Sequence, residues 1–231
     1  MSYLLLTCEH AVNFIPGEYS NILCIPANVL NSHLGYDEGA LDLFKFLSKE
    51  INCTSISGNC SRLLIDLNRS ESSKSLFSKY SGKLALNQKQ SIVEKYYFPY
   101  RRKVEHFVSE KVKQHKKVIH VSIHSFTPIF NNKTRKADIG LLYDPDRSIE
   151  VEISNDIRKN FLNLKTNFNI IVRRNYPYRG VTDGMTSYLR KKFKQPDYAG
   201  IELEINQRLF KEKLKYDEIK INLSDVLKKL V

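Results

Sequence analysis

Two histidines in a short apolar stretch are the first residues of this chain that could do chemistry. The stretch 118-VIHVSIHSFTP-128 carries His120 and His124 among alternating apolar residues and stops at Pro128. Such alternation is typical of a β-strand, which would place His124 near the strand's end. An imidazole there can be a structural residue at the rim of the core, or it can be a ligand for a metal ion.

Polar side chains follow other apolar runs of the chain in the same way. They are Glu9 and His10 after 3–8, Asn68 and Arg69 after 62–67, Ser125 after His124, and Glu204 near the end of 200–205. In open α/β sheets, ligands bind outside the carboxyl ends of the strands. We therefore expect these side chains to converge on one cleft.

A histidine pair from two strand ends could bind zinc. Catalytic zinc commonly takes three protein ligands from His, Asp and Glu and leaves the next position to water. His10 and His124 are two candidates, and Asp37, at the start of a predicted helix, is our choice for the third. The competing residues are Glu9, Glu18, Glu38 and His33, and His33 could instead orient a ligand from outside. The spacing is not a compact zinc motif, so structural roles, such as a helix N-cap for Asp37, stay open.

Charged residues within apolar runs suggest further roles. Asp66 lies in 61-SRLLIDLNRS-70 and would be costly to bury alone, so one interpretation is a structural pair with Arg62. Arg69, next to Asn68, could bind a substrate carboxylate through its guanidinium fork. Glu204 could be a general base beside a metal-bound water, or it could form a salt bridge with one of the many lysines.

The elements that must position these residues alternate between strand and helix. The predicted strands are 3–8, 62–67, 118–123, 138–143, 168–174 and 200–205, and the predicted helices are 37–51, 89–115 with an interruption at Pro99, 148–161, 183–193 and 223–231. This alternation predicts βαβ units and a largely parallel sheet with helices on both faces, an α/β fold of three αβα layers. Without repeats or linkers, residues 1–231 are predicted to form a single domain.

Composition narrows the class of protein. The chain has 231 residues, 42% of them hydrophobic, which is enough for a sizeable core. No apolar run reaches the roughly 18–20 residues that a membrane helix needs. The start, MSYLLLTCEH, lacks the basic region of a signal peptide, and the four cysteines form no CxxC pair. We therefore predict a cytoplasmic protein with reduced thiols and no membrane association.

The formal net charge of +12 makes nucleic acid or another anionic surface a conceivable partner. The densest basic stretches are 111-KVKQHKK-117, 190-RKKFK-194 and 211-KEKLK-215. Each is typical of the solvated face or end of a helix. Nucleic acid is therefore an unlikely partner, and a small anionic substrate is the partner that we predict.

Six segments together resemble the N-formylglutamate amidohydrolase family. They are 7-TCEHAVNFIP-16, 33-HLGYDEGA-40, 61-SRLLIDLNRS-70, 123-IHSFTP-128, 175-NYPY-178 and 202-ELEI-205. They occur in the family's order and span roughly residues 4 to 209. The resemblance implies a zinc-dependent amidase with a hydrolase fold similar to the phosphorylase/hydrolase-like zinc carboxypeptidases, with a mixed sheet of about eight strands.

The resemblance also implies roles for individual residues. One zinc ion would be held by His10, Asp37 and His124, of which Asp37 is inferred because Asn13 occupies the spacing of the carboxypeptidase carboxylate. Glu204 resembles the catalytic base, and Arg62 would help to stabilise the oxyanion. The residues that would contact the substrate are Asn68, Arg69, Ser125 and Tyr178.

The predicted reaction is hydrolysis of the linear amide of an N-formyl or N-acyl amino acid, for N-formylglutamate releasing formate and the amino acid. A zinc peptidase or amidase acting on a larger substrate is one alternative. A non-catalytic binding protein with the same fold, whose basic surface would bind an anionic partner such as nucleic acid, is another. Asn206 and Arg208 depart from the family pattern after Glu204, which puts the substrate in question.

Overall fold

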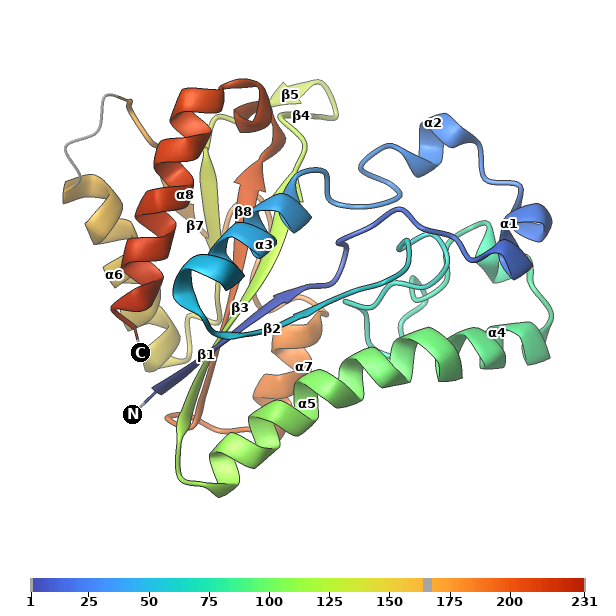
Figure 1. The fold of residues 1–231 in the computed structure, drawn as a ribbon, viewed down its shortest axis with the longest axis horizontal. Helices are drawn as coiled ribbons and strands as arrows, with labels where there is room; N and C mark the ends of the chain where they lie inside the picture. Colours follow the sequence, from blue (N-terminus) through green and yellow to red (C-terminus); the bar gives the residue numbers. More distant parts are fainter. Residues whose placement is uncertain (1, 164–167, 231) are drawn as a thin grey trace.

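The fold is an α/β sheet covered by helices, seen in a computed structural model that describes residues 2–163 and 168–230 (Figure 1). The main sheet has six strands in the order β2-β1-β3-β8-β6-β7. Their bounds are β2 Thr54–Ser57, β1 Ser2–Cys8, β3 Lys117–Phe126, β8 Tyr198–Asn206, β6 Ile139–Leu142 and β7 Val172–Arg174. A separate two-stranded ribbon joins β4 (Ile129–Phe130) to β5 (Lys133–Thr134).

The strand directions explain where the site can form. The strands β2, β1, β3 and β8 are parallel, whereas β6 runs antiparallel to β8 and β7 runs parallel to β6. The predicted mixed, mostly parallel sheet is therefore confirmed. The predicted number of about eight strands is wrong for this sheet, because the short β4 and β5 pair only with each other.

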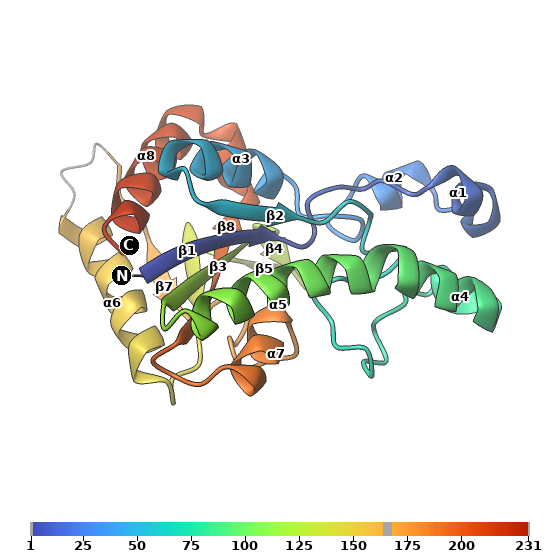
Figure 2. The same ribbon diagram turned by 60° about the horizontal axis from the view of Figure 1, so that its bottom comes forward.

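Helices cover both faces of the sheet, which confirms the three layers (Figures 1 and 2). One face is covered by α3 (Ala40–Ile51), α6 (Ser148–Asn163) and α8 (Lys213–Lys228), and the other by α5 (Phe98–Lys113) and α7 (Met185–Lys192). Successive residues of β1 divide between the two cores, because side chains of a strand alternate between its faces. Leu4 and Leu6 pack with α3 and α8, and Leu5 packs with α5 and α7.

Three short helices extend past the end of the sheet, at the right of Figure 1. They are α1 (Gly17–Leu23), α2 (Ala27–Leu30) and α4 (Leu86–Ile92). The helix predicted at 89–115 begins earlier, with α4, and passes through a π-helical turn, Val93–Tyr97, into α5. Pro99 lies in the first turn of α5, where its missing N–H coincides with the break in α-helical hydrogen bonding.

The strand predicted at 62–67 is wrong. These residues form turns, in which Leu64 N donates to Ser61 O at 2.9 Å and Ser61 Oγ donates to Gly35 O at 2.7 Å. Leu64 and Ile65 are fully buried, so the apolar run reflects burial in the core beside α5 rather than pairing in the sheet. A short apolar run cannot reveal which of the two it is.

Other boundaries also differ from the prediction. The last helix, predicted at 223–231, begins ten residues earlier at Lys213 and ends at Lys228. The strand predicted at 168–174 is only Val172–Arg174 in the sheet. The short edge strand β2 was not predicted. No helix within the described ranges is both long and apolar enough to span a membrane.

His120, the other histidine of the opening stretch, is structural. It is fully buried on β3, and its ring nitrogens lie 2.8 Å from Thr7 Oγ1 and 2.8 Å from Tyr198 Oη. Burial lowers the pKa of His120 from the ordinary 6.5 to about 4. The ring is therefore held neutral in the folded protein.

We expect His120 to make folding sensitive to acid. The unfolded chain binds a proton here between its higher pKa and about 4, so the free energy of unfolding decreases as pH falls through this window. Between pH 7 and pH 5 this contribution is about 2 kcal/mol. Denaturant unfolding at both pH values should show a smaller loss for His120→Gln than for the wild type. The exposed His106→Gln is the control, and an equal loss in His120→Gln would contradict the assignment.

Candidate active site

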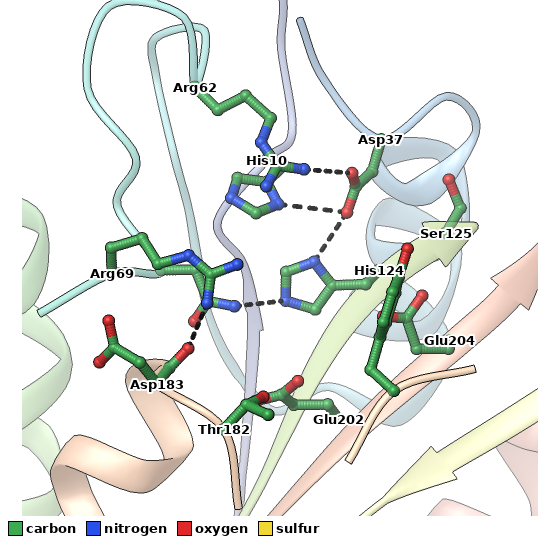
Figure 3. Close-up of a pocket in the computed structure, with 12 residues that line it drawn as sticks. His10, Asp37, Arg62, Arg69, His124, Ser125, Thr182, Asp183, Glu202 and Glu204 are labelled. Atoms are coloured by element: carbon green, nitrogen blue, oxygen red, sulfur yellow. Dashed lines mark hydrogen bonds and ion pairs between the residues drawn. The ribbon is translucent and has the colours of Figure 1, made fainter. Parts of the chain in front are cut away.

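One pocket of about 380 Å³ gathers the predicted site residues at the carboxyl ends of β1, β3 and β8 (Figure 3). All nine of them line it: His10, Asp37, Arg62, Asn68, Arg69, His124, Ser125, Tyr178 and Glu204. In the sequence these residues extend from His10 to Glu204, which is most of the chain. Residues at the ends of β1, β3 and β8 therefore converge as predicted, whereas Asn68 and Arg69 reach the same pocket from turns and not from a strand end.

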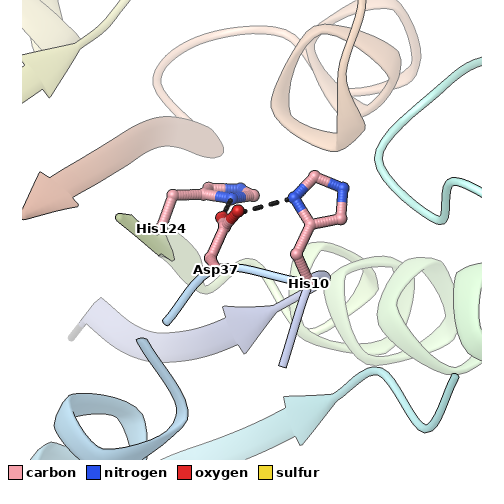
Figure 4. A group of neighbouring side chains, drawn as sticks. All are labelled: His10, Asp37 and His124. Carbon is pink, nitrogen blue, oxygen red and sulfur yellow. Dashed lines mark hydrogen bonds and ion pairs between the residues drawn. The ribbon is translucent and has the colours of Figure 1, made fainter. Parts of the chain in front are cut away.

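His10, Asp37 and His124 form a compact buried cluster at the centre of this pocket (Figure 4). Each residue offers one ligand atom, and these atoms all lie within 4.8 Å of one another. Asp37 Oδ2 lies 3.3 Å from His10 Nδ1 and 2.7 Å from His124 Nδ1. Two imidazole nitrogens and a carboxylate oxygen are a donor set that suits zinc, so these residues could hold a metal ion.

The outer nitrogen of each imidazole faces a second carboxylate. His10 Nε2 lies 2.7 Å from Asp66 Oδ1, and His124 Nε2 lies 3.2 Å from Glu9 Oε2. Such a carboxylate keeps the proton on Nε2, which leaves the Nδ1 lone pair for a metal. Both histidines are thus oriented as ligands by partners outside the cluster.

Asp37 reaches the cluster through a turn rather than from the end of a helix. The helix α3 begins at Ala40, so the predicted N-cap role of Asp37 is wrong. Its backbone N–H donates to His10 O at 3.0 Å, which joins the chain segments of two ligands. Gly39 follows with φ +74°, and a Cβ there would lie 2.2 Å from the Phe210 ring. Glycine therefore allows the turn that presents Asp37.

The competing third ligands lie elsewhere. Glu9 is fully buried but faces the outer nitrogen of His124. Glu18 forms an ion pair with Lys95 at 3.2 Å outside the pocket. Neither Glu38 nor His33 belongs to the pocket lining, and both are exposed.

The imidazoles and carboxylates of the cluster stabilise one another's charged forms. Burial by itself would lower the pKa of His124, but hydrogen bonds to Asp37 and Glu9 raise it well above its usual range. Burial would likewise lower the pKa of His10, but the charges of Asp66 and Asp37 raise it. The same contacts keep the pKa of each of these three carboxyls below its usual range despite burial.

Glu204 is the exception among the buried acids. It lies on β8 opposite His124 of β3 in the sheet register, and its Oε2 is buried without a hydrogen-bond partner among the described residues. Burial, together with the charges of Asp37 and Glu202, raises the pKa of Glu204 to about 8. A carboxyl with a raised pKa and an unpartnered oxygen beside a metal-ligand cluster can exchange protons with a substrate or water.

Arg69 and Asn68 come from the turn that was predicted as a strand. Arg69 is partly exposed, with its NH1 2.5 Å from Asp183 O and its Nε 3.8 Å from Asp66 Oδ2. Asn68 Oδ1 accepts from Met185 N at 2.7 Å, which turns its amide nitrogen towards His124. This arrangement leaves donors available to a carboxylate in the pocket.

Arg62 is bound to the acids of the cluster. Its NH2 lies 3.1 Å from Asp66 Oδ2 and its NH1 lies 3.5 Å from Asp37 Oδ1. The structural pair with Asp66 suggested by the sequence is therefore present. Arg62 also lines the pocket, so a structural role and contact with a ligand are compatible.

Ser125 and Tyr178 occupy the edge of the pocket. Ser125 Oγ donates to Glu38 O at 2.7 Å and accepts from Gln207 Nε2 at 3.1 Å. Tyr178 is 46% exposed, and its ring lies 5.3 Å from the guanidinium carbon of Arg135. Its exposure leaves the Tyr178 side chain free to cover a bound molecule.

Three further residues line the pocket without having been predicted as site residues: Thr182, Asp183 and Glu202. Strand alternation does place Glu202 on the face of Glu204, and this was the available signal. Thr182 and Asp183 lie in the loop before α7 and carried no signal of their own. The departures Asn206 and Arg208 lie outside the pocket lining, where Asn206 binds Ala137 O and Arg208 pairs with Asp138.

Solved structures of other proteins share this fold. The gene product Atu2144 of Agrobacterium tumefaciens has a similar crystal structure, with TM-score 0.82 and 29% identity over 99% of this chain and 90% of that one. The N-formylglutamate amidohydrolase of Ralstonia eutropha JMP134 shares the fold, with TM-score 0.73 and 16% identity over 100% and 93%. No curated protein matches the sequence. The sequence profile described as N-formylglutamate amidohydrolase matches residues 2–211, and the chain therefore belongs to the N-formylglutamate amidohydrolase family.

Proposed function

We propose that this protein is a zinc-dependent amidohydrolase that cleaves the amide of an N-formyl or N-acyl amino acid. Membership of the family points to hydrolysis of amide bonds. The observation that carries the proposal is the buried cluster of His10, Asp37 and His124 beside the unpartnered carboxyl of Glu204. Amide hydrolysis needs an activated water and a proton carrier, and this pair of features supports both.

His10, Asp37 and His124 would hold one zinc ion. When bound, zinc supplies Lewis-acid chemistry, which makes water more acidic and polarises a carbonyl. Asp66 and Glu9 keep the two imidazoles in the ligand orientation through their Nε2 contacts. All three residues of the cluster are buried, and burial strengthens the electrostatic interactions among them.

Glu204 moves the proton. In its ionised form Glu204 accepts a proton from the water whose oxygen attacks the amide carbon, and it returns that proton to the amine nitrogen as the C–N bond breaks. For an N-formyl substrate the products are formate and the free amino acid. Arg62, held by Asp37 and Asp66, lies at the same pocket and would stabilise negative charge that develops on the carbonyl oxygen.

Arg69 and Asn68 orient the substrate. The uncommitted donors of Arg69 and the amide nitrogen of Asn68 suit the carboxylate of an amino acid. Ser125 and Tyr178 would contact the substrate at the pocket's edge. The net charge of +12 would speed encounter with a small molecule that carries a carboxylate.

The proposed site predicts the metal content of the purified protein. Purified protein supplied with zinc should contain about one zinc per chain by elemental mass spectrometry, because a three-ligand catalytic site holds one ion. His124→Ala should lose most of it, while the exposed His106→Ala should keep it. Wild-type protein that holds no metal after zinc is supplied would refute the hydrolase proposal and favour a non-catalytic binding protein.

Removing the proton carrier should impair the chemical step rather than the metal site. We expect Glu204→Gln to lower kcat by about 10²–10⁴-fold while zinc content stays at the wild-type level. Steady-state kinetics on N-formyl amino acids, with metal analysis of the same samples, checks this. Glu152→Gln, an exposed change on α6, is the matched control. A kcat close to that of the wild type would remove Glu204 from the mechanism.

We expect Arg69 to contribute to substrate binding by contacting the carboxylate of the substrate. Arg69→Ala should reduce kcat/KM for an N-formyl amino acid on the order of 10–100-fold, the value of a hydrogen bond to a charged group. The corresponding N-formyl amino acid amide, which has no carboxylate, should be much less affected. Equal losses for the acid and the amide would mean that Arg69 does not bind the carboxylate.

A further inference from the structure

Among the described residues, one cation that lines the pocket keeps an uncommitted guanidinium end for a carboxylate. Arg62 and Arg69 are the only basic residues, apart from the two histidines, among the described residues that line it. Both ends of the Arg62 guanidinium already contact the carboxylates of Asp37 and Asp66. Arg69 contacts Asp66 through Nε at 3.8 Å and donates NH1 to Asp183 O, so its NH2 remains for a ligand. An amino acid with a second carboxylate would find no second cation with an uncommitted end among the described residues that line the pocket.

Glu202 adds a negative charge at the same pocket. Its side chain is buried, and Oε1 accepts from Thr186 Oγ1 at 2.7 Å. No described cation lies within ion-pair distance of it, and no described residue hydrogen-bonds to Oε2. In the view of Figure 3, Glu202 lies below His124 next to Thr182, on the side away from Arg62.

The surrounding backbone makes room for this carboxylate. Gly184, at the start of α7, lies so close that a Cβ there would be 3.1 Å from Glu202 Oε1 and 3.2 Å from Asn68 Oδ1. Thr186, in the first turn of the same helix, donates to one oxygen of Glu202 and leaves the other towards the pocket. Glu202 is thus a positioned acid without a neutralising partner, which repels anions and attracts cations or hydrogen-bond donors.

We propose that Glu202 is a specificity-determining residue that selects N-acyl amino acids with a cationic or donor-bearing side chain and rejects acidic ones such as glutamate. The proposal rests on the amidohydrolase function proposed above. In it, Arg69 binds the α-carboxylate and Glu202 binds the side chain. The preferred substrate then carries one carboxylate and an ammonium group or a neutral donor.

Four substrates in two pairs test this: N-formyl-lysine with N-formylnorleucine, which lacks the ammonium group, and N-formylglutamine with N-formylglutamate, which has nearly the same shape. We expect the wild type to prefer lysine to norleucine and glutamine to glutamate by about tenfold or more in kcat/KM, because Glu202 attracts an ammonium group and repels a carboxylate. Glu202→Gln should remove most of both preferences. Glu152→Gln, which removes the same charge from an exposed position, should keep them.

The outcomes separate the two proposals. Hydrolysis of glutamate in preference to glutamine, or preferences that Glu202→Gln leaves intact, overturns the role of Glu202 but leaves the amidohydrolase function standing. If none of the four is hydrolysed, calorimetric binding of the same four decides. A charge preference in binding would support the specificity role of Glu202 without supporting the amidohydrolase function. Absence of binding, or binding without a charge preference, would overturn the role of Glu202. Should Glu202→Gln not fold, the wild-type ratios within the two pairs give the same decision.

Discussion

The rest of the site depends on one contact, the approach of two histidines to a single carboxylate oxygen. Asp37 Oδ2 lies against the Nδ1 atoms of His10 and His124 in a buried position. Burying such charges is costly unless each is paired and hydrogen-bonded. The surrounding acids Glu9 and Asp66 supply the remaining pairing, and the cluster is therefore an interlocked network that fixes its own geometry.

The sheet gives this network its precision. β1 delivers His10 just past its end, β3 delivers His124, and β8 delivers Glu204 directly opposite His124 in parallel register. Because strands set side-chain positions more rigidly than loops do, the candidate metal ligands and the proposed proton carrier keep their separation. The groups proposed to contact substrate, Asn68 and Arg69, come instead from turns at the rim.

Two glutamates on the same face of β8 have different environments. Glu204 is surrounded by the cluster and has a raised pKa, whereas Glu202 has one oxygen held by Thr186 and the other towards the pocket. One position suits proton transfer and the other suits recognition of a side chain. A single strand can thus carry both functions because its residues alternate with a period of two.

The sequence by itself determined the class of fold and most of the site. Alternating strand and helix signals predicted three layers and a mostly parallel sheet, since hydrophobic periodicity is a local property. The rule that ligands bind at strand ends, with the family motifs, predicted nine residues that do line one pocket. Metal binding by His10, Asp37 and His124, the identity of the substrate and the single-domain assignment stay predictions.

Only the tertiary structure decided how those residues are held. The run at 62–67 reads as a strand but folds into turns, because burial against helices gives the same apolar signal as burial in a sheet. Asp37 reads as a helix cap but is placed by a bond to His10, 27 residues away. The places of Thr182 and Asp183 in the pocket, and the unpartnered oxygen of Glu202, depend on neighbours distant in sequence, because pairing and burial are non-local.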